Sequence, residues 1–338
     1  TPCGTLFPYT TLFRSTVVVG RDMRPHSAPL AEALFRGLTA QGVEVTDIGV
    51  VSTPMNYFAN GTLGVDGSIM ITASHNPGEY NGFKMCRRGG LPLSGDEGIK
   101  DIEKIICNDN YAPAAGGGAV KTADLKEQYW EMLAGFIEFD GKPSITVDYA
   151  NAMGAVEIDG IKDRFAIQPL FEELDGSFPN HEANPLDPDN MVDVSAAVKE
   201  QGTLFGAAFD GDADRCGFVD EDGETISMDL ITGIIARNVL KRGPANILCD
   251  LRSSRSVRED IAANGGTPVM SRVGHAFMRG VDLNGKLEPI LDGQRGKGKR
   301  PFFLPQALFI YRHHGGLAGF KTVAHRLFGD DAAHIVIQ

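Results

Sequence analysis

Three aspartates separated by single small residues stand in the stretch Asp210-Gly-Asp-Ala-Asp-Arg215. If this stretch turns, the spacing can aim three carboxylates at one point, and carboxylates this dense repel one another unless a cation holds them. Oxygen-only ligands suit a hard divalent cation, Mg²⁺ before Ca²⁺. The sequence therefore predicts a magnesium site at Asp210, Asp212 and Asp214, with the guanidinium of Arg215 beside it and suited to a phosphate.

The same loop allows two alternatives to a magnesium site. An EF-hand is one, because the three aspartates and Glu221 have the spacing of EF-hand ligands. It fails because Arg215 stands where that loop needs glycine, and because the preceding Leu204–Phe209 predicts a strand rather than a helix. A solvated acidic loop without a metal is the weaker alternative, since its charges would repel one another.

A second candidate is the segment Thr72-Ala-Ser-His-Asn-Pro77, which follows an apolar run. This position presents Ser74 at the rim of a sheet, but a serine is a poor nucleophile without a base or a metal. A hydrolase using Ser74 and His75 is disfavoured, because the G-x-S-x-G motif is absent and adjacent residues rarely have the required geometry. A plain Asn-Pro turn stays open as an alternative. Downstream, Lys84 places a cation within reach of the same loop.

A third candidate lies in Arg252-Ser-Ser-Arg255 and Ser271-Arg-Val-Gly-His275, each of which follows a predicted strand. Arg252 and His275 could hold a phosphate or a sugar hydroxyl. Arg255 could equally be part of a helix surface.

These loops need a scaffold, and short apolar runs alternating with amphipathic segments predict α/β layers with mixed, mostly parallel sheets. The pattern starts three times, which indicates repeated three-layer α/β domains at residues 16–140, 141–242 and 243–338, the last incomplete. In such sheets ligands bind beyond the carboxyl ends of strands.

The main strands are predicted at Thr16–Gly20, Val43–Val51, Ser68–Thr72, Ser144–Val147, Leu204–Phe209, Asn246–Cys249 and Thr267–Met270. Helices are predicted to begin at Ser27 and to span Ser94–Ile106, Ala123–Phe139, Gly160–Leu174, Met228–Leu240 and Ser253–Asn264.

The composition is that of an ordinary globular protein of 338 residues with a net charge of −12, which argues against a nucleic-acid backbone as the main partner. No apolar run reaches the length of about 18 residues that a membrane span needs, and no secretory signal is recognisable. The five cysteines are scattered without C-x-x-C spacing. This pattern favours neither a disulfide scaffold nor a zinc site, and it predicts a cytoplasmic protein.

Both ends of the chain differ in character from the middle. Residues 5–15, TLFPYTTLFRS, resemble the translation of a sequencing-library adapter, and residues 1–15 are expected to be artefactual or unstructured. Residues 280–338 hold 8 Lys or Arg against 5 Asp or Glu. The basic run Gly293–Arg300 could be a nucleic-acid patch. A reading-frame error near Arg279 is the preferred interpretation, because the periodic patterns largely stop there.

Taken together and in this order, the loops resemble the α-D-phosphohexomutases, in their phosphomannomutase/phosphoglucomutase branch. The resemblance runs from about residue 16 to residue 279. The stretches that carry it are Val19–Arg24, Ile71–Lys84, His181–Pro188, Phe209–Gly217, Asp250–Arg255 and Arg272–Phe277.

The resemblance implies four α/β domains and an enzyme that interconverts hexose 1-phosphate and 6-phosphate, of glucose or mannose, through a bisphosphorylated sugar. Ser74 would be the phosphoserine, and its phosphoryl oxygen would share one Mg²⁺ with the three aspartates. The resemblance places His75 and Lys84 in the catalytic site. It assigns substrate contacts to Arg215, Arg252, His275 and Arg24. The sequence Asn-Gly-Phe-Lys ending at Lys84 favours the hexose branch over the phosphoglucosamine mutases.

The chain departs from the family at both ends. A first strand bearing an arginine is expected before Thr16, a Gly-Glu-x-Ser-Gly-His loop is expected after His275, and a fourth domain should follow; none is recognisable. The chain as written is therefore expected to be inactive or nearly so, because remote binding energy is lost. The alternative interpretation is a Mg²⁺-binding phosphoprotein that does not turn over a substrate.

Overall fold

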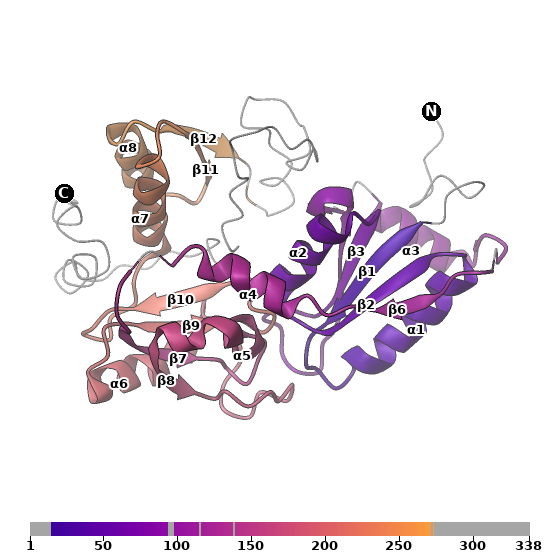
Figure 1. Ribbon diagram of the computed structural model, residues 1–338, viewed down its shortest axis with the longest axis horizontal. Helices are drawn as coiled ribbons and strands as arrows, with labels where there is room; N and C mark the ends of the chain where they lie inside the picture. The colour runs from indigo at the N-terminus through magenta and orange to yellow at the C-terminus, as the bar shows by residue number, and fades with distance from the viewer. Residues whose placement is uncertain (1–14, 94–97, 115, 138, 272, 274–338) are drawn as a thin grey trace.

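The computed structural model describes residues 15–93, 98–114, 116–137, 139–271 and 273. These residues form three α/β units in chain order, each with its own sheet (Figure 1). The predicted fold class, α/β with mixed and mostly parallel sheets, is confirmed. None of the helices in the described residues is long and apolar enough to cross a membrane.

The first unit is built on a six-stranded sheet in the order β5-β4-β3-β1-β2-β6. Its strands are β1 (Thr16–Arg21), β2 (Glu44–Val50), β3 (Gly67–Ile71), β4 (Phe83–Arg87), β5 (Leu91–Pro92) and β6 (Val120–Thr122). Strands β3, β1, β2 and β6 run parallel, whereas β4 and β5 pair antiparallel at one edge. Helices α1 (Ser27–Ala40) and α2 (Thr53–Leu63) cover opposite faces, because successive residues of a strand point to opposite sides. A further helix, α3 (Ile99–Cys107), begins after residues 94–97, which lie outside the described residues.

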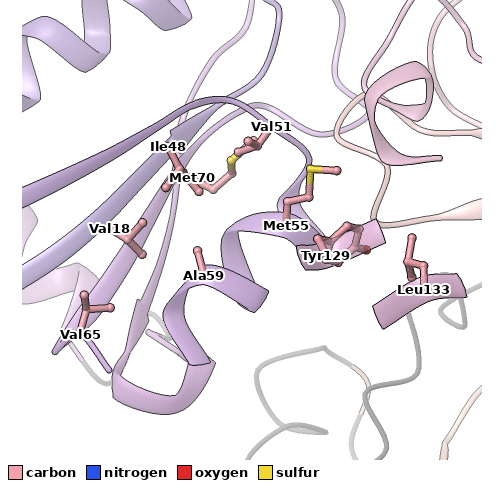
Figure 2. Packing of buried hydrophobic residues seen from close by; sticks show 9 residues of the cluster. All are labelled: Val18, Ile48, Val51, Met55, Ala59, Val65, Met70, Tyr129 and Leu133. Atoms are coloured by element: carbon pink, nitrogen blue, oxygen red, sulfur yellow. The ribbon is translucent and has the colours of Figure 1, made fainter. Parts of the chain in front are cut away.

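The face toward α2 is a continuous apolar cluster (Figure 2). Val18 and Met70 from the sheet meet Met55 and Ala59 from α2. Helix α4 (Lys126–Ala134) adds Tyr129 and Leu133 to the same cluster. The helix that leads toward the second unit is therefore packed into the core of the first.

The second unit has a four-stranded sheet in the order β10-β9-β7-β8. Its elements are β7 (Ser144–Asp148), α5 (Gly154–Glu157), β8 (Ala166–Leu170), α6 (Val192–Gln201), β9 (Gly206–Phe209) and β10 (Cys216–Val219). Strands β8, β7 and β9 are parallel, and β10 returns antiparallel to β9. The predicted metal loop therefore connects two neighbouring strands as a hairpin.

The helix predicted at Gly160–Leu174 is wrong. A 3₁₀ turn over Asp159–Arg164 leads into strand β8 instead. Pro169 lies within β8 opposite Val147, and it is tolerated because β8 is an edge strand. A proline in this position disfavours a helix interior more strongly than the apolar spacing favours one.

The third unit contains β11 (Asn246–Asp250) and β12 (Thr267–Ser271), which pair in parallel. They pack with α7 (Met228–Leu240) and α8 (Arg255–Ala263) through a cluster containing Ala236 and Ile261. The opposite end of α7 packs against the second unit, because Leu230 lies against Ile226 and Phe218. Helix α7 therefore belongs to the cores of both units.

One hydrogen-bonded pair in the second unit should make stability depend on pH. His181 Nε2 lies 3.0 Å from Asp148 Oδ2, and Asp148 is fully buried at the end of β7. The hydrogen bond to Asp148 raises the pKa of His181 above 6.5. The stabilisation is thus complete below about pH 6.5 and is lost as pH rises through the folded-state pKa. We expect His181→Gln to cost more unfolding free energy at about pH 6 than at about pH 9 in denaturant titrations. An equal cost at both pH values would contradict this assignment.

Candidate active site

The loop between β9 and β10 turns tightly enough to bring its three carboxylates together. The N–H of Asp210 donates to the carbonyl oxygen of Arg215 at 3.1 Å, and Ala213 has a left-handed backbone with φ of 59°. Asp210 and Asp212 are completely buried. Ligand oxygens of Asp210, Asp212 and Asp214 all lie within 4.8 Å of one another. The turn that the spacing requires is therefore present.

Ser74 reaches this loop from the first unit. It follows β3 in a tight turn with φ of 55°, and its N–H donates to Thr72 Oγ1 at 2.9 Å. Its hydroxyl donates to Asp210 Oδ2 at 3.0 Å, although the two residues are far apart in the chain. Ser74 is buried, so the pair is screened from solvent. The site is thus formed where the first two units meet.

Lys84 extends from β4 into the same cluster. Its Nζ lies 2.5 Å from Asp212 Oδ2, 2.6 Å from Asp214 Oδ2 and 3.4 Å from Ser74 Oγ. Burial alone would lower the pKa of Lys84, but the two aspartates raise it above its usual value. For Asp212 the directions are reversed: burial alone would raise the pKa of its carboxyl, but the charge of Lys84 holds this pKa below its usual value. Burial and the neighbouring carboxylates raise the pKa of Asp210.

Arg215 and His75 form a pair at the rim of the cluster. Arg215 Nη1 lies 2.7 Å from His75 Nδ1, and Arg215 Nε is 3.7 Å from Asp214 Oδ1. Burial and then the charge of Arg215 lower the pKa of His75, so the imidazole accepts the hydrogen bond in its neutral form. This arrangement keeps a fixed positive charge at the site.

The donor set fits a divalent metal ion. Asp212 Oδ1 is buried and has no hydrogen-bond partner among the described residues. A buried carboxylate oxygen in this state is costly unless a ligand satisfies it. Three carboxylates and the hydroxyl of Ser74 supply the all-oxygen environment that Mg²⁺ prefers.

Thr53 at the start of α2 belongs to the site, although sequence reasoning missed it. Its hydroxyl donates to Asp212 Oδ2, and its N–H donates to the carbonyl oxygen of Asp212 at 3.0 Å. The only sequence signal is a helix start, because Ser52 caps α2 and Pro54 stands in its first turn. That signal predicts a helix terminus but says nothing about the distant loop it meets.

Arg24, which the resemblance assigns to a substrate contact, instead directs its side chain toward the backbone of the Ser74 loop. Its side chain is completely buried behind the Ser74 loop. The guanidinium donates to the carbonyl oxygens of that loop and to the carboxylate of Asp22, so all five of its N–H donors are engaged. The loop carbonyls are those of Ser74, Asn76, Pro77 and Tyr80, at 2.6 to 3.0 Å.

The third-unit candidates stand apart from this cluster. Arg252 follows β11 and pairs with Asp250, Nε to Oδ2, at 3.0 Å. Its side chain is 38% exposed and is therefore accessible to a ligand. The substrate contact of Arg252 stays a prediction. His275 lies outside the described residues, as do residues 1–14 and 274–338. The expectations for these segments also stay predictions.

Known proteins are similar to this chain over the described units. The family model described as phosphoglucomutase/phosphomannomutase, alpha/beta/alpha domain I, matches residues 6–112, and that of domain II matches residues 127–223. A phosphomannomutase of Escherichia coli (strain K12) is 39% identical over 276 residues, which are 78% of this chain and 60% of the relative. A phosphoglucomutase of Neisseria meningitidis serogroup B is 37% identical over 266 residues, covering 78% of this chain and 57% of the relative.

Among solved structures, a phosphoglucomutase/phosphomannomutase family protein from Burkholderia thailandensis superposes with a TM-score of 0.74 at 36% identity. The match covers 78% of this chain and 59% of that protein. The chain thus spans about 60% of the length of the curated relatives it matches. Two successive family models and the shared fold show that the chain belongs to the α-D-phosphohexomutase family.

Proposed function

We propose that the chain holds Mg²⁺ at Asp210, Asp212 and Asp214 and carries a phosphoryl group on Ser74, which it exchanges with a hexose phosphate. The observation that carries the proposal is the position of Ser74 Oγ, 3.0 Å from Asp210 Oδ2 and 3.4 Å from Lys84 Nζ. Phosphoryl transfer needs positioning and charge neutralisation more than covalent help from the protein. A hydroxyl enclosed by carboxylates and an ammonium group is suited to that task.

The names of the relatives support glucose or mannose phosphates as substrates. Transfer of a phosphoryl group from Ser74 to such a monophosphate would form the corresponding 1,6-bisphosphate. In the transfer, the bond from phosphorus to Ser74 Oγ breaks and a bond from phosphorus to a sugar hydroxyl oxygen forms. The net reaction moves the proton of that hydroxyl to Ser74 Oγ, and the ammonium of Lys84 is placed to donate to this oxygen. Bound Mg²⁺ would neutralise charge on the phosphoryl oxygens. Arg215, held by His75, adds a fixed positive charge.

The test is to incubate the chain with Mg²⁺ and glucose or mannose 1,6-bisphosphate and to follow its intact mass. We expect one phosphoryl group on Ser74, its slow loss when hexose 6-phosphate is added, at a rate far below that of the longer relatives, and no phosphorylation in Ser74→Ala. Asp212→Asn should weaken Mg²⁺ binding by at least about tenfold in a calorimetric titration, because it removes a ligand charge. Asp222→Asn is the matched control, since this exposed aspartate lies beyond β10, outside the cluster.

Two outcomes would contradict the proposal. If Asp212→Asn and Asp222→Asn bind Mg²⁺ as tightly as the unaltered chain does, the loop is not the metal site. If phosphate is incorporated on Ser74 but never leaves it when hexose phosphates are added, the chain is a phosphoprotein without turnover.

A further inference from the structure

A buried carboxyl group outside the aspartate cluster joins three separate segments. Glu157, the last residue of α5, is 4% exposed. Its Oε2 accepts a hydrogen bond from the hydroxyl of Ser52, and its Oε1 accepts one from the hydroxyl of Tyr129. Ser52 precedes α2 in the first unit, Tyr129 lies in α4, and Glu157 belongs to the second unit. The carboxyl therefore fastens the first unit and α4 to the second unit.

Among the described residues, the side chains that donate hydrogen bonds to this carboxyl are the hydroxyls of Ser52 and Tyr129. Burial, partly offset by the hydrogen bonds from Ser52 and Tyr129, raises the pKa of Glu157 to about 7. A carboxyl is an expensive group to bury without a cationic partner. Its position is therefore better explained by the two hydroxyls that it orients than by a contribution to packing.

The hydroxyl of Ser52 leads directly to the aspartate loop. Ser52 Oγ accepts the N–H of Met55 at 3.1 Å and thereby caps α2. The next residue, Thr53, donates both its hydroxyl and its N–H to Asp212. The first turn of α2 is thus held by the second unit at two adjacent residues, by Glu157 at one and by Asp212 at the other.

This double attachment fixes the direction of the Asp212 carboxylate. Oδ2 is taken by Thr53 and Lys84, while Oδ1 is buried without a partner among the described residues. If the start of α2 shifted, the hydroxyl of Thr53 would no longer hold Oδ2 of Asp212. The carboxylate could then rotate, and Oδ1 would leave its present orientation. The position of Ser52 therefore determines how well Asp212 can serve as a ligand.

We propose that Glu157 is a positioning residue for the magnesium site, acting through Ser52 and Thr53 on Asp212. The inference rests on the proposed function, because it assumes that the aspartate loop binds Mg²⁺. Groups that orient metal ligands are typically worth about 10-fold to 100-fold in metal affinity. The Tyr129 hydroxyl binds the same carboxyl but leads into the apolar cluster of the first unit, away from the loop.

The two hydroxyls make a matched pair for the test. Ser52→Ala and Tyr129→Phe each remove one hydroxyl from the same carboxyl. We expect Ser52→Ala to weaken Mg²⁺ binding about tenfold in a calorimetric titration of the full chain. We expect Tyr129→Phe to leave Mg²⁺ affinity within about twofold of the unaltered chain while lowering the midpoint of urea unfolding. Equal losses of Mg²⁺ affinity in both variants would overturn the proposal.

Replacement of Glu157 itself completes the test. Glu157→Met should weaken Mg²⁺ binding about tenfold, and Glu157→Gln, which keeps hydrogen-bonding atoms in place, should restore it. In a Thr53→Val background, Glu157→Met should have little further effect, because the hydroxyl that holds the Asp212 carboxylate is already absent, although the backbone N–H of residue 53 still donates to the carbonyl oxygen of Asp212. Additive losses would show that Glu157 acts by another route and would overturn the proposal. Val43→Ala, in the apolar cluster on the opposite face of the first sheet, controls for general destabilisation and should leave Mg²⁺ affinity unchanged.

The two proposals fail separately. Absence of Mg²⁺ binding at the aspartate loop, shown by an Asp212→Asn variant that behaves like the unaltered chain, overturns the proposed function. Mg²⁺ binding that depends on Asp212 but is unaffected by Ser52→Ala and Glu157→Met overturns only the role of Glu157.

Discussion

Replacement of Arg24 by methionine is expected to cost about 3–5 kcal/mol of unfolding free energy, the usual cost of removing one partner of a buried ion pair. The carboxylate of Asp22 would stay buried without its partner, and the Ser74 loop would lose four hydrogen bonds to its carbonyl oxygens. The guanidinium also lies 4.9 Å from the ring centroid of Phe178, a contact that methionine reproduces only in part. Urea unfolding monitored by circular dichroism measures the loss.

Two further variants separate the buried charge from the change of side chain. Arg88→Met makes the same substitution in an exposed pair with Asp66 and should cost less than about 1 kcal/mol. Asp22→Asn combined with Arg24→Met removes both charges and should cost less than the sum of the single changes. If Arg24→Met costs no more than Arg88→Met, the buried guanidinium does not support the Ser74 loop.

Gly211→Ala is expected to separate the Ser74 loop from the aspartate loop. A Cβ at Gly211 would lie 2.2 Å from the carbonyl oxygen of Ser74, a backbone atom that cannot turn aside. The two loops would have to move apart, so overpacking should cost about 1–3 kcal/mol of unfolding free energy. A displacement of about 1 Å between reacting groups can cost about 100-fold in rate. We therefore expect phosphorylation of Ser74 by hexose 1,6-bisphosphate to slow by about 100-fold, measured by a time course of intact mass.

Gly37→Ala provides the matched control. A Cβ at this position in α1 meets no atom within 4 Å, so alanine should raise stability by about 0.5–1 kcal/mol and leave phosphorylation unchanged. A Gly211→Ala variant that phosphorylates Ser74 as fast as Gly37→Ala would show that the two loops need not be in contact.

The sequence was sufficient for the parts of the site whose chemistry is local. Asp210, Asp212 and Asp214 are brought together by one turn, so their spacing already contained the geometry. Ser74 and Lys84 could be placed near them because the resemblance to a known family joins their loops. The structure then confirmed the α/β class and brought both loops to one place.

The parts that could not be predicted depend on contacts between distant segments. The neighbours of Thr53 mark only a helix start, and those of Glu157 mark nothing distinctive, whereas each makes its decisive contact with a residue more than 100 positions away. Arg24 has the same character, because nothing local tells whether a guanidinium faces a ligand or the back of a loop. The helix predicted over Gly160–Leu174 is wrong at β8, where Pro169 disfavours a helix, and the edge position of this strand in the sheet explains why the proline is tolerated.

The hydrogen bond between Ser74 and Asp210 joins residues 136 positions apart. During synthesis, the strands of the first sheet are complete once β6 has left the ribosome, but the hairpin of β9 and β10 is made almost 100 residues later. Contacts that close so long a segment of chain form late, because the entropy of loop closure must be overcome first. A nascent chain therefore has the strands that carry the serine loop before it has the aspartates that face this loop. If these aspartates bind Mg²⁺ as proposed, metal binding would follow assembly of the first two units.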